Sequence, residues 1–147
     1  MTTTPNSTEP LSPLSPSDER TWAMLAHLSV LANLVTGFLG TLLALVIYLV
    51  YKDRSRYVGY HAIQSFVFQL IWWVAAGTIA GIAWAISGAL VVVVGLGCLL
   101  MPIALLITLI PIAALVYGVI GAVQCSQGVD FRYWLVGDWV RGTLEST

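Results

Sequence analysis

The absence of charged residues from two long stretches is the feature that most limits what this chain can fold into. Neither residues 21–51 nor residues 57–129 contain Asp, Glu, Lys or Arg. A charge at the centre of a bilayer costs at least about 2.5–3.5 kcal/mol, so long charge-free stretches are typical of membrane segments. Only 9% of the 147 residues are charged and 59% are hydrophobic, whereas a soluble domain has about 25% charged residues. We therefore predict an all-α integral membrane protein.

The two stretches together predict four helices. The second is long enough for two membrane helices of about 20 residues or more, which we place at residues 57–86 and 99–124, separated by the Ser- and Gly-containing segment 87–97. A single helix over residues 22–50 would be roughly 43 Å long, against a hydrocarbon core of about 30 Å. Two short helices hinged near Gly37 fit better. The prediction is a four-helix transmembrane bundle of two short and two long helices, with three spans as the alternative.

The basic residues predict which parts of the chain share one side of the membrane. Cytoplasmic loops carry an excess of Lys and Arg, and in the four-helix arrangement all six basic residues fall on one side. They are Arg20, Lys52, Arg54, Arg56, Arg132 and Arg141. Both termini are therefore predicted to be cytoplasmic.

Three regions follow from these assignments. We expect a disordered cytoplasmic tail over residues 1–18, a helical membrane domain over 19–128 and an interfacial C-terminal tail over 129–147. The N-terminal tail is rich in Ser, Thr and Pro and lacks the features of a signal or transit peptide. This favours a bacterial plasma membrane protein.

Small residues at helical spacing predict close helix packing. Gly77, Gly81 and Ala85 lie four residues apart, and Gly118 continues a similar pattern on the last helix. Small side chains let helix backbones approach closely in lipid. The contact is expected within the chain or, alternatively, between two copies.

A polar cluster at a helix start is the candidate interaction face. His61, Gln64 and Ser65 share one side of a helix directly after the basic segment 52–56. We predict that this face binds an acidic partner segment or lipid headgroups. The alternative is a helix start that is merely hydrated.

The sequence predicts no catalytic, cofactor or metal site. Within the charge-free stretches, only His27 and His61 are candidates for the acid–base residues of an enzyme. We expect no Cys or carboxylate near them that would complete a metal site. Cys98 and Cys125 are expected to be small packing residues. A net charge of −1 without a basic cluster argues against nucleic acid binding.

Three segments together resemble a known family. They are RTWAMLAHLS at 20–29, Lys52-Asp53 followed by YHAIQSFVFQ at 60–69, and GVDFRY at 128–133. In order and spacing they resemble small bacterial membrane proteins grouped with the Tic-twenty component of the chloroplast import channel. The resemblance covers residues 19–140. It implies a helical membrane domain of four helices and does not transfer protein import.

These observations predict a non-enzymatic multi-pass membrane protein of the Tic-twenty-like group. We expect an interaction or scaffold module, or a subunit of a transport assembly. The alternative is an oligomeric conduit for small solutes or peptides. The expected partners are the lipid bilayer and either other membrane proteins or further copies of the chain.

Overall fold

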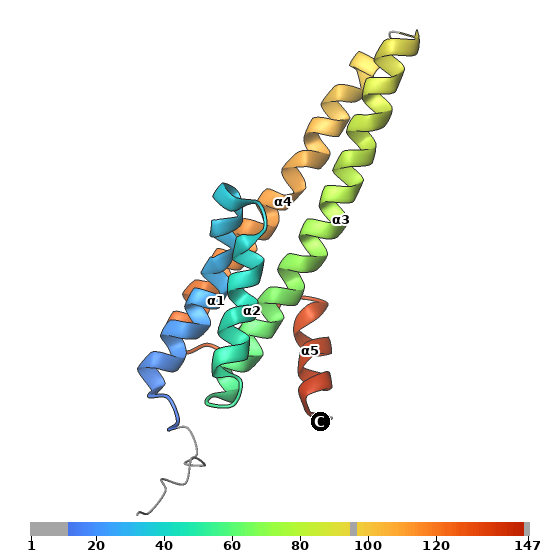
Figure 1. The fold of residues 1–147 in the computed structure, drawn as a ribbon. Coiled ribbons are helices and arrows are strands. Elements are labelled where there is room, and N and C mark those ends of the chain that lie inside the picture. The colour runs from blue at the N-terminus through green and yellow to red at the C-terminus, as the bar shows by residue number, and fades with distance from the viewer. Residues whose placement is uncertain (1–11, 95–96, 146–147) are drawn as a thin grey trace, which may run out of the picture.

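The computed structural model describes residues 12–94 and 97–145, and the regular secondary structure of this part of the chain is all helical, without strands. The five helices are α1 (Pro16–Thr36), α2 (Leu39–Tyr51), α3 (Arg56–Val94), α4 (Gly97–Ser126) and α5 (Val136–Glu145). Figure 1 shows α3 and α4 as a long antiparallel hairpin. Helices α1 and α2 pack against one half of this hairpin, and α5 lies beside α3 at the same end. We call the half that contains α1, α2, α5 and the adjoining ends of α3 and α4 the base. We call the other half of the α3–α4 hairpin, which includes Gly77, Gly81, Ala85 and Cys98, the stalk.

Helix α1 begins inside the predicted N-terminal tail. The Ser15 hydroxyl accepts a hydrogen bond from the backbone N–H of Asp18 (3.2 Å), as helix-capping side chains do. Pro16 follows at the first helical position, where its missing N–H is harmless. Residues 16–18 are therefore helical, and residues 1–11 of the predicted tail lie outside the described part of the chain.

The turn between α1 and α2 lies at the predicted hinge. Gly37 has φ +75°, a conformation that glycine adopts without steric penalty, and its N–H donates to the carbonyl of Asn33 (2.9 Å). Beyond the turn the two helices are in close contact. A Cβ at Gly40 would clash with the carbonyl oxygen of Ser29 and the side chain of Asn33.

The predicted break at residues 87–97 is wrong at its start, because α3 continues without interruption to Val94. The Ser87 hydroxyl donates to the carbonyl of Ala83 within the same helix (2.8 Å), so it does not compete for other backbone groups. A helix in lipid must satisfy every backbone hydrogen bond internally. This requirement outweighs the weak helix propensity of Ser87 and Gly88.

The two long helices account for the membrane character of the chain. Helices α3 and α4 are long and apolar enough to cross a bilayer. Their 39 and 30 residues correspond to roughly 58 and 45 Å, compared with a hydrocarbon core of about 30 Å. Helix α2 is apolar but has only 13 residues. The all-α membrane class is thus supported by the structure, while the crossing of all four helices remains a prediction.

The C-terminal tail is only in part the interfacial segment that was predicted. Phe131 and Tyr133 are buried in the base, at 5% and 1% exposure, whereas Trp134 and Trp139 are exposed. The ring of Tyr133 stacks on Phe68 with centroids 3.9 Å apart. The segment 129–135 therefore places two of its side chains, Phe131 and Tyr133, in the core of the bundle, while its other five residues are exposed. Both described chain ends lie at the base (Figure 1).

Candidate functional site

The base holds an unusual number of buried polar side chains. Helix α1 contributes His27, Ser29 and Asn33, α2 contributes Thr41, and α3 contributes His61, Gln64, Ser65 and Gln69, all at most 3% exposed. A buried polar group without a hydrogen-bond partner is costly. These residues divide into an amide network around Gln69, a docking contact at Gln64 and a cluster around the two histidines.

The amide network joins the first three helices. The Nε2 group of Gln69 donates to the hydroxyls of Ser29 and Ser65, both at 2.9 Å. Its Oε1 accepts from Asn33 Nδ2 (2.9 Å) and from the Thr41 hydroxyl (3.4 Å). A side-chain amide has two N–H donors and two acceptor positions, so Gln69 uses its full capacity. The network holds α1, α2 and α3 in register.

Gln64 docks the C-terminal segment onto α3. Its Nε2 donates to the carbonyl of Phe131 (3.1 Å), and its Oε1 accepts from the backbone N–H of Tyr133 (3.1 Å) and the hydroxyl of Tyr60 (3.0 Å). Buried backbone N–H and C=O groups need hydrogen-bond partners, and an irregular segment cannot supply them from its own backbone. The Gln64 side chain supplies them for Phe131 and Tyr133. This contact explains how residues 129–135 enter the base.

The predicted interaction face at His61, Gln64 and Ser65 is not at the surface. All three residues have 0% exposure. Segment 129–135 covers Gln64, and α1 covers Ser65, whose hydroxyl donates to the carbonyl of Ala26 (2.7 Å). Because the cover comes from distant parts of the chain, the pattern within α3 could not reveal it.

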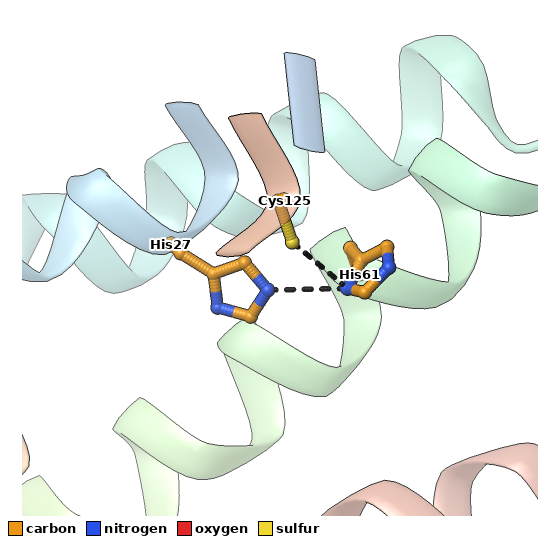
Figure 2. Close-up of side chains that lie close together, drawn as sticks. All are labelled: His27, His61 and Cys125. Atoms are coloured by element: carbon orange, nitrogen blue, oxygen red, sulfur yellow. Dashed lines mark hydrogen bonds between the residues drawn. The ribbon is translucent and has the colours of Figure 1, made fainter. Parts of the chain in front are cut away.

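A histidine cluster lies where α1, α3 and α4 meet. Figure 2 shows His27, His61 and Cys125 pointing toward one another from these three helices. The Nε2 atom of His27 lies 3.3 Å from Nδ1 of His61, and the Sγ atom of Cys125 lies 3.4 Å from the same nitrogen. All three residues are fully buried. The expectation that no cysteine lies near the histidines is therefore wrong.

The outward nitrogens of both histidines face residues of the C-terminal segment. Nδ1 of His27 is hydrogen-bonded to the Tyr133 hydroxyl (3.0 Å). Burial raises the pKa of Tyr133 above its ordinary value, so this hydroxyl stays neutral. Nε2 of His61 has no hydrogen-bond partner among the described residues, and the nearest carboxylate oxygen, from Asp130, is 3.8 Å away.

Asp130 also connects the cluster to the surface. Nη2 of Arg141 lies 2.7 Å from both of its carboxylate oxygens, and this hydrogen bonding raises the pKa of Arg141. The guanidinium of Arg141 also lies over the ring of Tyr60, at 4.4 Å. These contacts tie α5 to the start of α3, with Asp130 between the solvent and the buried histidines.

The residues predicted to pack helices fall into two groups. Gly118 is buried against α1, where an added Cβ would come within 2.7 Å of the Val30 side chain. Gly77 and Gly81, by contrast, are exposed on the stalk with no described atom within 4 Å of an added Cβ, and Ala85 is exposed as well. The expected contact within the chain is absent at these three positions of the stalk.

Comparison with known proteins corrects the family assignment. No curated protein and no solved structure matches the chain. Residues 18–140, however, match the MamF/MmsF family, described as a magnetosome magnetite crystal formation protein family. The match spans α2, α3 and α4 completely, most of α1 and the first half of α5, so the Tic-twenty-like assignment is wrong. The chain belongs to the MamF/MmsF family of magnetosome membrane proteins involved in magnetite crystal formation.

Proposed function

We propose that this chain is a non-enzymatic scaffold of the magnetosome membrane that takes part in magnetite crystal formation. The observation that carries this proposal is the family match over residues 18–140, which includes both the polar core of the base and the apolar stalk. The structure adds three arguments for a scaffold, concerning the buried polar groups, the apolar groove and the exposed face of the stalk.

The buried polar groups support a structural role over a catalytic one. A catalytic acid, base or nucleophile must come within hydrogen-bond reach of its substrate. In the base, the Gln69 amide uses all four of its hydrogen-bond positions on protein groups and the Gln64 amide uses three. His27, His61 and Cys125 are buried, with 0% exposure. These side chains are arranged to hold helices together.

An apolar groove beside the base supports a scaffold over a conduit. It has a volume of about 330 Å³ and lies between α1, α3 and α4, where apolar side chains predominate. The side chains of its two uncharged polar residues, Gln69 and Thr108, both already form hydrogen bonds within the protein. Gln69 belongs to the amide network, and the Thr108 hydroxyl donates to the Ala104 carbonyl (2.8 Å) and accepts from Trp84 (3.0 Å). A polar solute would find few free partners here, whereas an acyl chain would fit.

The stalk offers a surface for a second copy of the chain. Gly77, Gly81 and Ala85 form an exposed small-residue face on α3, and the GxxxG spacing suits close helix contact in lipid. At 3.6 residues per turn, the exposed apolar side chains of Val74 and Trp84 lie beside this face. We propose that the stalk lies in the bilayer and that two copies meet there.

The charge distribution supports a cytoplasmic base. All six basic residues belong to the base: Arg20, Lys52, Arg54, Arg56, Arg132 and Arg141. The described parts of the stalk carry no charge. By the positive-inside rule, the base and both described chain ends would face the cytoplasm, and the tip of the stalk would face the opposite side.

The proposal is tested in a magnetite-forming bacterium that carries the gene. Deleting the gene should change the size or shape of the magnetite crystals seen by electron microscopy. A tagged copy should restore wild-type crystals and should co-fractionate with the magnetosome membrane. Unchanged crystals in the deletion strain, or a tagged protein confined to other membranes, would contradict it.

A further inference from the structure

We propose that His27, His61 and Cys125 form a binding site for a divalent transition-metal ion of the zinc type, with two imidazole nitrogens and one thiolate as ligands. The site joins α1, α3 and α4 at the centre of the base (Figure 2). It is independent of the proposed role in crystal formation, because it rests only on the geometry of these three side chains.

The spacing of the donor atoms fits a metal ion. Zinc bonds are about 2.0–2.1 Å to nitrogen and about 2.3 Å to sulfur, which puts the donor atoms of a tetrahedral site roughly 3.3–3.6 Å apart. The separations of 3.3 Å between His27 and His61 and 3.4 Å between His61 and Cys125 match this range. All three donor atoms lie within 4.8 Å of one another, so the remaining pair needs a movement of no more than about 1.3 Å.

Hydrogen bonding alone does not explain the cluster. Nδ1 of His61, when it is the acceptor, offers one lone pair. Both Nε2 of His27 and Sγ of Cys125 lie within hydrogen-bonding distance of it, and only one of them can donate along that lone pair. A metal ion at the centre of the three atoms would engage the lone pairs of all of them at once.

The outer contacts orient both imidazoles for metal binding. Histidine ligands usually donate their second ring N–H to a carboxylate, carbonyl or water. His27 can donate from Nδ1 to the Tyr133 hydroxyl at 3.0 Å, which leaves the Nε2 lone pair for the metal. Nε2 of His61, which has no hydrogen-bond partner among the described residues, lies 3.8 Å from a carboxylate oxygen of Asp130, and Nδ1 on the other side of the ring faces the metal position.

Charge and donor type select the metal. Binding converts the Cys125 thiol to a thiolate and releases one proton to solvent. A divalent ion together with this thiolate has a net charge of +1. The carboxylate of Asp130 faces this charge from the other side of the His61 ring. Imidazole with thiolate suits Zn²⁺ and copper, and Fe²⁺ binds such sites more weakly than Zn²⁺. The bound ion would therefore link α1, α3 and α4 as a structural metal, and the site would not hold iron for the mineral.

Cobalt(II) titration of the purified, metal-stripped full-length protein tests the site. Wild type should bind one Co²⁺ per chain with the absorption of a cobalt–thiolate bond, and added Zn²⁺ should abolish that absorption and raise Tm. An excess of Fe²⁺ should displace Co²⁺ less well than Zn²⁺ does. Folded wild-type protein with neither the absorption nor a Zn²⁺-dependent rise in Tm would overturn the proposal.

The two cysteines provide the matched control. Cys98→Ser alters an exposed residue at the far end of the stalk and should keep the absorption. Because the chain has only two cysteines, a retained signal in this variant assigns the thiolate to Cys125 even if Cys125→Ser fails to fold. Loss of the absorption in Cys98→Ser would place the metal at Cys98 and overturn the assignment.

Discussion

Replacing Gln69 by Leu tests whether the amide network holds the base together. The substitution puts a branched apolar side chain, one bond shorter, in place of the amide and removes all four hydrogen bonds to Ser29, Ser65, Asn33 and Thr41. Side-chain hydrogen bonds between helices in membrane proteins contribute about 0.6 kcal/mol each on average. Four of them amount to about 2–3 kcal/mol.

The partners that remain limit the loss to that range. Without Gln69, the Asn33 amide still has the Thr41 hydroxyl at 3.2 Å, and the Ser29 and Ser65 hydroxyls still donate to the Ala26 carbonyl. Only the Thr41 hydroxyl loses its acceptor, and its bond to Gln69 is the longest of the four at 3.4 Å, so the larger penalty for orphaned buried groups applies to at most this one donor. The free energy of unfolding should fall by about 2–3 kcal/mol.

Unfolding in detergent, followed by circular dichroism, measures this difference. The matched control is Gln124→Leu, because Gln124 is half-buried and its side chain makes no hydrogen bond within the described part of the chain. That variant should stay within about 0.5 kcal/mol of wild type. If Gln69→Leu unfolds at the same point as Gln124→Leu, the network does not stabilise the base and our reasoning is refuted.

Three further substitutions or labels follow from local geometry. Gly121→Ala should destabilise the fold by about 1–3 kcal/mol in detergent melts, since its Cβ would lie 2.7 Å from the Phe131 ring; an unchanged melting point would contradict the packing described for segment 129–135. Tyr133→Phe removes the hydrogen bond to His27 but keeps the ring that stacks on Phe68, so unfolding measurements should show a loss of about 0.5–1.5 kcal/mol. A membrane-impermeant thiol reagent should label the exposed Cys98 only from the side opposite the base, and labelling from the cytoplasmic side would reverse the proposed orientation.

Charge placement predicted the all-helical class, because charges are excluded from hydrocarbon whatever the tertiary fold, but it did not predict α5, and the four-helix transmembrane bundle stays a prediction. The helical class and the turn at Gly37 follow directly from the charge-free stretches and the position of glycine. The continuation of α3 through Ser87 and Gly88 did not follow, since helix propensities measured in water understate how strongly a helix persists in lipid.

The core could not be predicted, because its contacts join residues far apart in the sequence. His61 and Cys125 are 64 positions apart, and Gln64 and Phe131 are 67 apart. Periodicity within α3 shows that His61, Gln64 and Ser65 share a face, but it does not show whether α1 and segment 129–135 cover that face or leave it open. The candidate metal ligand Cys125 was missed for the same reason.

The mistaken family resemblance has a structural explanation. It rested on residues 20–29, 60–69 and 128–133, and the structure brings the polar and aromatic residues of these segments together in one core. A core motif of this kind reports how helices pack. It says little about what the protein does.

The most direct test of the scaffold proposal combines the exposed stalk face with the crystals. Apart from the adjoining backbone of α3, no described atom lies within 4 Å of a Cβ added at Gly77 or Gly81, so the monomer of the Gly77→Leu, Gly81→Leu double variant should fold and reach the membrane at wild-type abundance. In a strain lacking the chromosomal gene, wild type should restore the size distribution of the magnetite crystals measured by electron microscopy, and the double variant should not. Full restoration by the double variant at equal abundance would contradict the account.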